Sequence, residues 1–344
     1  MGQVVRFAAP RTVEIVEEPE PKLGPGQVRL RTLYSGVSAG TELTAYTGTN
    51  PYLTKRWDPD ARLFAPGSTS IDYPTDGWGY EEIGEIVEVG NGVRGLEAGQ
   101  RVWGIWGHRT STVQDESYVR DRLLPAGANP LVGVFSHIGS VALNAVLDAE
   151  VHLGETVVVF GLGVAGQLAA QFARLNGARV IGVDLIGARL DVGRRLGADE
   201  VLDASEGRVA ERVCELTHGR GADVCIEASG AYPALHEAIR AVSYGSRVVA
   251  AGFYQGEGTG LALGEEFHHN RVQLVCSQIS SVAPHLRHRW DRYRLQRTVM
   301  DLATSGRLEV PALVTHVIAL TEASRAFRLL DESPEQALQV VLQG

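Results

Sequence analysis

Two hydrophobic patterns follow one another along the chain. Up to about residue 132, apolar and polar residues alternate over short runs separated by Gly and Pro, which is typical of strands with one covered face. These runs are Val4–Phe7, Val13–Val16, Gln27–Tyr34, Ile83–Val89 and Arg101–Ile105. The pattern predicts a β-rich first domain.

From about residue 133, uninterrupted apolar runs alternate with helical segments, which predicts a parallel sheet covered on both faces. The predicted strands are Thr156–Phe160, Arg179–Val183, Asp223–Glu227 and Arg247–Gly252. Residues 281 to 344 add a basic segment, two helices and a strand, too little for a domain of their own. We therefore expect one domain from residues 1–132 and 281–344, and a second from residues 133–280.

Composition limits the partners that the protein can have. The 344 residues carry a net charge of -9, which argues against nucleic acid. We expect no apolar run to approach the roughly 20 residues of a spanning helix, and the first residues lack the regions of a signal peptide. The three cysteines, Cys214, Cys225 and Cys276, show no disulfide or metal spacing. We expect a cytoplasmic protein with a small-molecule substrate and no membrane or nucleic-acid partner.

A glycine motif marks a cofactor site. Gly161, Gly163 and Gly166 form a G-x-G-x-x-G between a predicted strand and a predicted helix, with Val164 and Ala165 inside it. About 20 residues further on, the next strand ends in Asp184, whose carboxylate suits a ribose 2′-hydroxyl and repels a 2′-phosphate. This context predicts NAD. Arg189 leaves NADP open, because an Arg near the acid can accommodate the phosphate.

Several further segments, spread over nearly the whole chain, carry a family resemblance together with the glycine motif. They are Gly24-Pro-Gly-Gln-Val28, Ser35-Gly-Val-Ser-Ala-Gly-Thr-Glu42, Gly79-Tyr-Glu-Glu-Ile-Gly84, Gly99-Gln-Arg-Val102 and Asp223-Val-Cys-Ile-Glu-Ala-Ser-Gly230. With these segments the sequence resembles the medium-chain dehydrogenase/reductase superfamily. The segment that starts at Ser35 and the one that starts at Gly79 look like those of its bacteriochlorophyllide dehydrogenase-like branch.

That resemblance implies an α/β protein: a GroES-like β-rich catalytic domain and a Rossmann NAD-binding domain with a doubly wound parallel sheet. It also implies that Ser229 and Gly252 lie at the cofactor, and that the edge strand Arg271–Ser277 pairs two copies as a homodimer.

The residues depart from the zinc-dependent members of that superfamily. The positions of the three metal ligands carry Ser38, Tyr80 and Ser136, and among their neighbours only Glu81 could bind zinc. We therefore expect an enzyme without a metal.

Without zinc, a hydrogen-bond donor must stabilise the oxyanion that develops during hydride transfer. The resemblance points to Tyr80, with Glu42 as its proton partner and Ser38 or Thr41 as further hydroxyl contacts. An alternative remains open, in which Tyr80 only fills the space of the lost metal and Glu42 caps a turn. His137 is another candidate proton carrier.

The segment between Glu42 and Glu81 is long and rich in aromatic residues, and predicts a specificity loop or a self-packed surface loop. The candidate substrate-binding residues are Tyr52, Lys55, Trp57, Trp106 and His137. A second notable segment, His285–Arg297, carries five arginines and predicts either a solvated helix face or an anion pocket.

These residues together predict an NAD(H)-dependent, metal-free oxidoreductase that interconverts a polar secondary alcohol, such as a sugar or cyclitol, and its ketone. Two alternatives remain: reduction of an enone or quinone, and nucleotide sensing without turnover.

Overall fold

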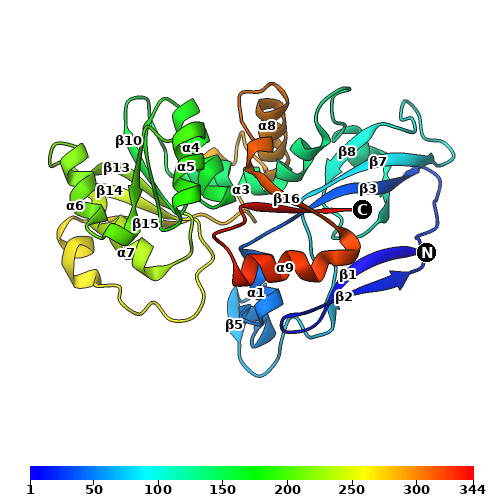
Figure 1. The fold of residues 1–344 in the computed structure, drawn as a ribbon, viewed down its shortest axis with the longest axis horizontal. Helices are drawn as coiled ribbons and strands as arrows, with labels where there is room; N and C mark the ends of the chain where they lie inside the picture. The colour runs from blue at the N-terminus through cyan, green and yellow to red at the C-terminus, as the bar shows by residue number, and fades with distance from the viewer. The chain divides into compact units, whose positions relative to one another are not determined.

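The computed structural model describes residues 1–344 and divides the chain into two units (Figure 1). Unit 1 consists of Met1–His137 and Val310–Gly344, and unit 2 of Ile138–Glu309. The expected boundaries at 132/133 and 280/281 therefore differ from the observed ones. The basic segment and the helix after it belong to unit 2, because they pack there before the chain returns.

Unit 1 is built on the long strand β3 (Gln27–Val37), which pairs with β7 (Glu82–Val89) on one side and with β17 (Gln339–Gln343) on the other. The sheet order is β16-β17-β3-β7-β8, and β9 also pairs with β3. A smaller sheet has the order β2-β1-β6. The other bounds are β1 (Gly2–Ala9), β2 (Thr12–Glu18), β6 (Thr75–Asp76), β8 (Arg101–Gly104), β9 (Ser111–Asp115) and α2 (Glu116–Arg120).

The C-terminal segment Val310–Gly344 completes unit 1. Strand β16 (Val314–Ala319) lies parallel to β17, and α9 (Ala323–Glu332) packs against α1 (Thr41–Thr47) and β2 (Figure 1). The ring of Phe327 meets Phe7 edge-on at 4.9 Å and stacks on Tyr46 at 5.5 Å. Burial of such rings fixes α9 on the sheet, since truncating a buried Phe to Ala costs about 3–5 kcal/mol.

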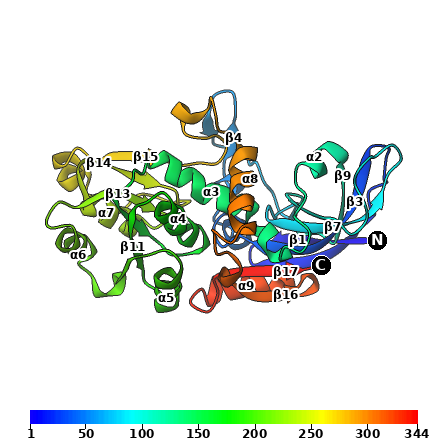
Figure 2. The ribbon, with the colours of Figure 1, turned by 90° about the horizontal axis from the view of Figure 1, so that it is seen from above.

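Unit 2 has a six-stranded parallel sheet in the order β12-β11-β10-β13-β14-β15. Its strands are β10 (Thr156–Phe160), β11 (Arg179–Asp184), β12 (Glu200–Asp203), β13 (Ala222–Glu227), β14 (Val242–Ala250) and β15 (Gln273–Cys276). The middle positions of the central strands are mostly apolar and buried, as expected for strands that helices cover (Figure 2). The covering helices are α4 (Val164–Leu175), α5 (Gly187–Leu196), α6 (Val209–Leu216) and α7 (Tyr232–Ala241). The predicted Rossmann architecture is confirmed.

Two further helices complete unit 2. Helix α3 (Phe135–Asp148) begins in unit 1 and continues into unit 2, and α8 (Arg292–Thr304) precedes the chain's return. The expectation that no stretch has the length and apolar character of a membrane span was wrong, because Pro130–Asp148 has both. Of its most apolar window, 72% is buried inside the protein, which is the behaviour of a core helix.

Candidate active site

The predicted hydroxyl groups of unit 1 come together at Tyr80. The Tyr80 side chain is half-buried, and its hydroxyl donates to Ser38 Oγ at 2.5 Å. The ring of His137 meets the Tyr80 ring edge-on, with 4.8 Å between centroids. No protein group accepts the hydroxyl proton of Ser38, so this proton is available to another acceptor.

The expected direct relay between Glu42 and Tyr80 was wrong. Glu42 lies fully buried in the first turn of α1, and its Oε2 is 2.6 Å from Nε2 of His108. Its other oxygen has no hydrogen-bond partner. Glu42 is also not the cap of a turn, since the helix begins at Gly40 without a side-chain cap. The imidazole of His108 competes successfully for the carboxylate because both groups are excluded from water.

His108 connects Glu42 to a second carboxyl group. Its Nδ1 lies 2.6 Å from Ser35 Oγ, and the Ser35 hydroxyl donates to Glu82 Oε1 at 2.9 Å. The backbone N–H of Trp106 donates to the other oxygen of Glu82 at 2.8 Å. The four side chains that these hydrogen bonds link are 0% exposed: Glu42, His108, Ser35 and Glu82. We call them the buried network.

Counting protons assigns a charge to His108. With Glu82 ionised, the one hydroxyl proton of Ser35 goes to Glu82, and the Ser35 oxygen then accepts from Nδ1–H. With Nε2–H donating to Glu42, both ring nitrogens are donors, which is the hydrogen bonding of an imidazolium. This assignment comes from the network, because hydrogen positions follow from the heavy atoms. The network is a cation held between two carboxylates.

The surroundings raise the pKa values of both His108 and Glu82, and the shift of His108 favours its charged form. Burial alone lowers the pKa of His108, but the charge of Glu42, its hydrogen bond and the charge of Glu82 outweigh burial and raise it. Burial also raises the pKa of Glu82, and the charge of His108 with the bonds from Trp106 and Ser35 reverses only part of that. The folded state therefore holds protons here that the unfolded chain releases.

Glu81 is a buried carboxyl group outside the network. Neither of its oxygens has a hydrogen-bond partner, and the Gln339 amide nearby donates instead to the carbonyls of Val37 and Val340. Burial, followed by the charges of Glu42 and Glu82, raises its pKa well above the ordinary value. The shift favours the protonated form of Glu81. The expectation that Glu81 could bind zinc does not fit a protonated carboxyl group.

The same charges act on Tyr80. Burial, then Glu81 and Glu42, raise the pKa of its phenol, while the hydroxyls of Ser38 and Thr41 lower it only in part. Tyr80 is thus held as a neutral hydrogen-bond donor, and it is a poor base.

Two glycines make room for this arrangement. A Cβ on Gly79, whose φ is +109°, would lie 2.7 Å from both Glu82 Oε1 and the backbone nitrogen of His108. A Cβ on Gly36 would lie 2.4 Å from Glu81 Oε2. Side chains at these positions would displace the carboxyl groups.

The three positions that hold zinc in metal-dependent relatives offer hydroxyl groups only. Ser38 and Tyr80 bond to each other, and Ser136 Oγ is buried without a partner. No group of three or more His, Cys, Asp or Glu side chains is arranged to hold a metal ion. Zinc prefers thiolate, imidazole or carboxylate ligands, so these residues do not fit it.

The predicted substrate-binding residues lie in different surroundings. Trp106 is a core residue rather than a pocket wall, because it is 8% exposed and its indole donates to Thr32 at 3.0 Å. In the loop after α1, Phe64 contacts Tyr52 and Trp57 at ring distances of 5.5 and 5.1 Å. This aromatic cluster is partly exposed, and Lys55 beside it is exposed. The loop also carries η1 (Pro51–Leu53), β4 (Arg56–Asp58) and β5 (Leu63–Ala65).

The glycine loop of unit 2 has the geometry of a dinucleotide cradle. Gly161 has φ +84°, and a Cβ on Gly166 would lie 1.7 Å from the Gly161 carbonyl oxygen, which only glycine avoids. A Cβ on Gly163 would meet nothing, so a ligand can approach the backbone there. Helix α4 begins with Val164, which Ala165 follows, and no side chain caps it. Its N-terminus is open to a pyrophosphate.

Asp184 is held ready beside this loop. Its two oxygens accept from the backbone N–H groups of Leu162, at 2.6 Å, and Ile186, at 2.9 Å. A carboxylate has further lone pairs, which remain for ribose hydroxyls. These residues fit an adenosine ribose.

The remaining cofactor candidates frame the loop. A Cβ on Gly161 would lie 2.7 Å from Cβ of Ser229, and one on Gly252 would lie 2.2 Å from the backbone nitrogen of Gly230. The Ser229 hydroxyl donates to Glu227, so Ser229 supports the loop through packing. Arg189 lies on α5, and its carbonyl accepts from Gln167 at 2.8 Å.

Sequence reasoning missed His108, Ser35 and Glu82 as functional residues. Nothing in their spacing marks them, since they lie on separate segments of the chain. One sequence feature was present: two adjacent acids, Glu81 and Glu82, lie where a strand begins. Alternation would expose one of the two, but the structure buries both.

Comparison with known proteins gives the family. A family model described as zinc-binding dehydrogenase matches residues 163–293. D-guloside 3-dehydrogenase of Shigella flexneri is 31% identical over 340 residues, covering 96% of this chain and 97% of the relative. Sorbitol dehydrogenase of Halalkalibacterium halodurans is 27% identical, with 95% and 94% covered.

Solved structures share the fold. One of a Sinorhizobium meliloti protein bound to NADP has a TM-score of 0.78 at 21% identity and covers 100% of this chain and 99% of its own. An alcohol dehydrogenase from Escherichia coli complexed with NADH also has a TM-score of 0.78, at 20% identity and the same coverage. These likenesses confirm the α/β fold with GroES-like and Rossmann parts.

The chain belongs to the zinc-binding dehydrogenase family of the medium-chain dehydrogenase/reductase superfamily. It is an oxidoreductase of that family. The expected placement in the bacteriochlorophyllide dehydrogenase-like branch has no support from these relatives.

His108→Gln should destabilise the protein by about 3–5 kcal/mol, because it leaves Glu42 buried without its cation. The raised pKa of His108 also makes the free energy of unfolding depend on pH. The contribution of His108 is complete below about pH 6.5 and is lost as pH rises through the pKa of the folded state. Glu81 and Glu82 act in the same direction. Urea unfolding between about pH 6 and 9 should show falling stability in the wild type and a shallower fall in the variant.

The exposed His268 supplies the control, since His268→Gln should keep the wild-type slope. Equal slopes for wild type and His108→Gln would contradict the charged network.

Proposed function

We propose that the protein interconverts a secondary alcohol of a sugar or polyol and its ketone, with a nicotinamide cofactor and without a catalytic metal. One observation carries the proposal: Tyr80 and Ser38 form a hydroxyl pair at the positions of the lost metal ligands, beside carboxyl groups that keep Tyr80 a neutral donor. A pair of donors at that place can do the electrostatic work that zinc does in metal-dependent relatives.

The bound nicotinamide would supply or accept the hydride. The proton moves separately: ketone reduction takes up one hydride and one proton, and alcohol oxidation releases both. Tyr80 donates to Ser38, and the free hydroxyl proton of Ser38 can go to the substrate oxygen as negative charge develops there. Tyr80 keeps its own proton because its pKa is raised, and solvent supplies the proton that replaces the one passed on by Ser38. Thr41 is the nearby hydroxyl that supports this pair.

The substrate class rests on two observations. The relatives named above act, by their names, on a guloside and on sorbitol, both rich in secondary hydroxyl groups. The partly exposed cluster of Tyr52, Trp57 and Phe64 offers aromatic faces, which suit the apolar faces of a sugar ring. A polar donor pair favours a carbonyl over an activated carbon–carbon double bond, so alcohol chemistry is preferred to enone reduction.

Tyr80→Phe keeps the packing and removes one donor, so kcat should fall on the order of 100–1000-fold. NADH affinity should be unchanged, because Tyr80 has no contact with the glycine loop or with Asp184, which are proposed to hold the cofactor. Steady-state kinetics with a panel of polyols, ketones and enones measures the first effect and titration calorimetry the second. A variant that retains more than about a third of kcat would show that Tyr80 only fills space.

Metal independence follows from the donor chemistry of Ser38, Tyr80 and Ser136. Elemental analysis of protein purified without added metal should find well below one zinc per chain, and a chelator should leave turnover intact. Stoichiometric zinc with chelator-sensitive turnover would contradict this proposal.

A preference for NAD over NADP rests on Asp184, whose spare lone pairs suit ribose hydroxyls and whose charge repels a 2′-phosphate. NADH should bind at least about tenfold more tightly than NADPH, and Asp184→Ala should narrow that ratio. Equal affinities of the wild type for the two cofactors, measured by calorimetry, would overturn the preference.

We further propose a homodimer that works in the cytoplasm. Strand β15 lies at the edge of its sheet with Leu274 43% exposed, and an unpaired apolar edge favours pairing with a second copy. The three cysteines are free thiols, as in a reducing compartment. Light scattering should give a mass well above the 37.0 kDa of one chain, and a monomer at micromolar concentration would contradict the dimer.

A further inference from the structure

A second pocket lies within unit 2, away from the glycine loop. It has a volume of about 350 Å³ and is bounded by the C-terminal parts of α3 and α4, the turn η5 (Pro284–Leu286) and α8. We call it the edge pocket. Its volume is at the lower end of the range for small-molecule sites, about 300–1,000 Å³.

The floor of the edge pocket is apolar. Leu143 and Val146 of α3, Phe172 of α4 and Leu286 of η5 line it, and all four are at most 8% exposed. Leu175, at the end of α4, also lines the pocket and is 41% exposed. Water in this pocket would therefore lie against hydrocarbon, and an apolar ligand group that displaces it gains free energy.

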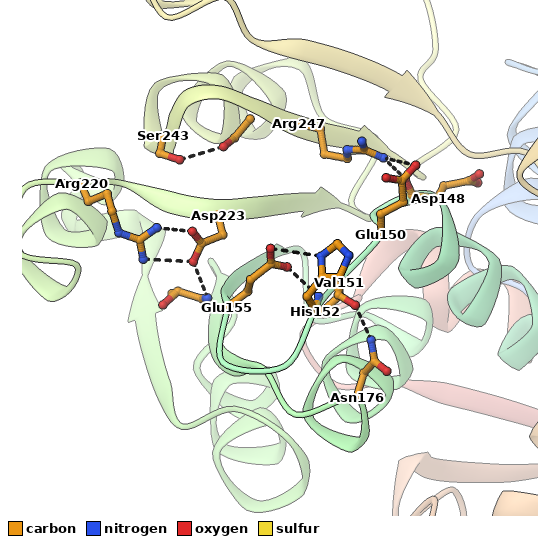
Figure 3. A network of polar contacts seen from close by, with 12 residues as sticks. Asp148, Glu150, Val151, His152, Glu155, Asn176, Arg220, Asp223, Ser243 and Arg247 are labelled. Atoms are coloured by element: carbon orange, nitrogen blue, oxygen red, sulfur yellow. Dashed lines mark hydrogen bonds and ion pairs between the residues drawn. The ribbon is translucent and has the colours of Figure 1, made fainter. Parts of the chain in front are cut away.

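The pocket lies at the edge of the sheet where the parallel strands begin. Val151 and His152 line it and precede β10, whereas the glycine loop follows β10. Figure 3 shows this edge, where the Asn176 amide donates to the Val151 carbonyl at 2.6 Å. Helix α4 begins at the glycine loop and ends at the pocket, which separates the two by about 18 Å. A ligand here does not occupy the cofactor site.

The mouth of the pocket has excess positive charge. Its one acidic residue, Glu150, is paired with Arg247 at 2.9 Å and lies 3.8 Å from His285 (Figure 3 shows the first pair). Arg289 and Arg307 also line the mouth, and neither guanidinium has an acidic partner or a hydrogen-bond acceptor in the protein. An anion placed between these arginines would meet uncompensated cations.

We propose that the edge pocket binds a small amphipathic carboxylate, with its hydrocarbon chain on the apolar floor and its carboxylate at Arg289 and Arg307. A sugar phosphate suits the pocket less well, because the floor would leave its hydroxyl groups without partners. On this proposal, the basic segment 285–297 contributes to an anion pocket, one of the two predictions made for it. Arg289 is the part of that segment that lines the pocket, together with His285 and Leu286.

Calorimetry with octanoate as the probe tests the site, in the presence of saturating NADH. Octanoate should bind, and the affinity should rise about fourfold for each methylene added from butanoate to octanoate, which is the free energy of burying a methylene. Octanamide has the same chain without the charge and should bind at least about fivefold more weakly.

Arg289→Ala and Arg307→Ala should each weaken octanoate binding by about fivefold. Arg292→Ala is the matched control, since Arg292 belongs to the same basic segment and does not line the pocket, and its affinity should match the wild type. Because all three arginines are exposed, the variants should fold, and their thermal unfolding should confirm it.

Three results would overturn the proposal. Equal affinities for butanoate and octanoate would reduce the site to a charged surface without a pocket. Competition between octanoate and NADH would place the ligand at the cofactor. Binding to anionic vesicles that Arg292→Ala weakens as much as Arg289→Ala, without binding of free octanoate, would show a membrane-facing patch instead.

Discussion

A buried cation between two carboxylates organises unit 1. His108 joins Glu42 on α1 to Ser35 on β3 and, through it, to Glu82 on β7, so three separate elements meet at one imidazole. The backbone of His108 is fixed as well, because its N–H donates to the Trp78 carbonyl at 2.7 Å and its carbonyl accepts from Val5 at 2.9 Å. A buried ion pair is weak evidence for stability in itself, but breaking one is costly, so the pair fixes these elements in one arrangement. Tyr80 and Ser38 lie within that arrangement.

Charge balance then determines the chemistry that Tyr80 can do. Three carboxyl groups and one imidazole are buried close together, and a low-dielectric interior does not tolerate three uncompensated negative charges. The result is that the protonated forms of the Glu81 carboxyl group and of the Tyr80 phenol are both favoured. Oxidoreductases of this family with zinc stabilise the oxyanion by a metal charge, whereas in the account proposed here two hydroxyl groups do so, supported by the carboxyl groups behind them.

The sequence predicted elements and local motifs well, and contacts between distant segments poorly. Gly161, Gly166 and Asp184 were found because a cofactor loop needs those residue types at fixed spacing in one stretch. The family resemblance named Tyr80 and Ser38 as candidates for one site, whereas the hydrogen bond between them was not predicted. His108 could not be found this way, because its partners lie 66 and 73 residues away and no periodicity connects them. The same limit explains Trp106, which looks like an exposed aromatic in the sequence and is held in the core by Thr32.

The protonation state of His108 is the central claim, and nitrogen NMR of the imidazole tests it most directly. Protein labelled with ¹⁵N at histidine, compared with His108→Gln for assignment, should show both ring nitrogens of His108 protonated at about pH 7.5, above the ordinary pKa of histidine. That result establishes the imidazolium between Glu42 and Glu82. One protonated and one bare nitrogen at this pH would show a neutral ring with the proton on Glu82, and would contradict the account.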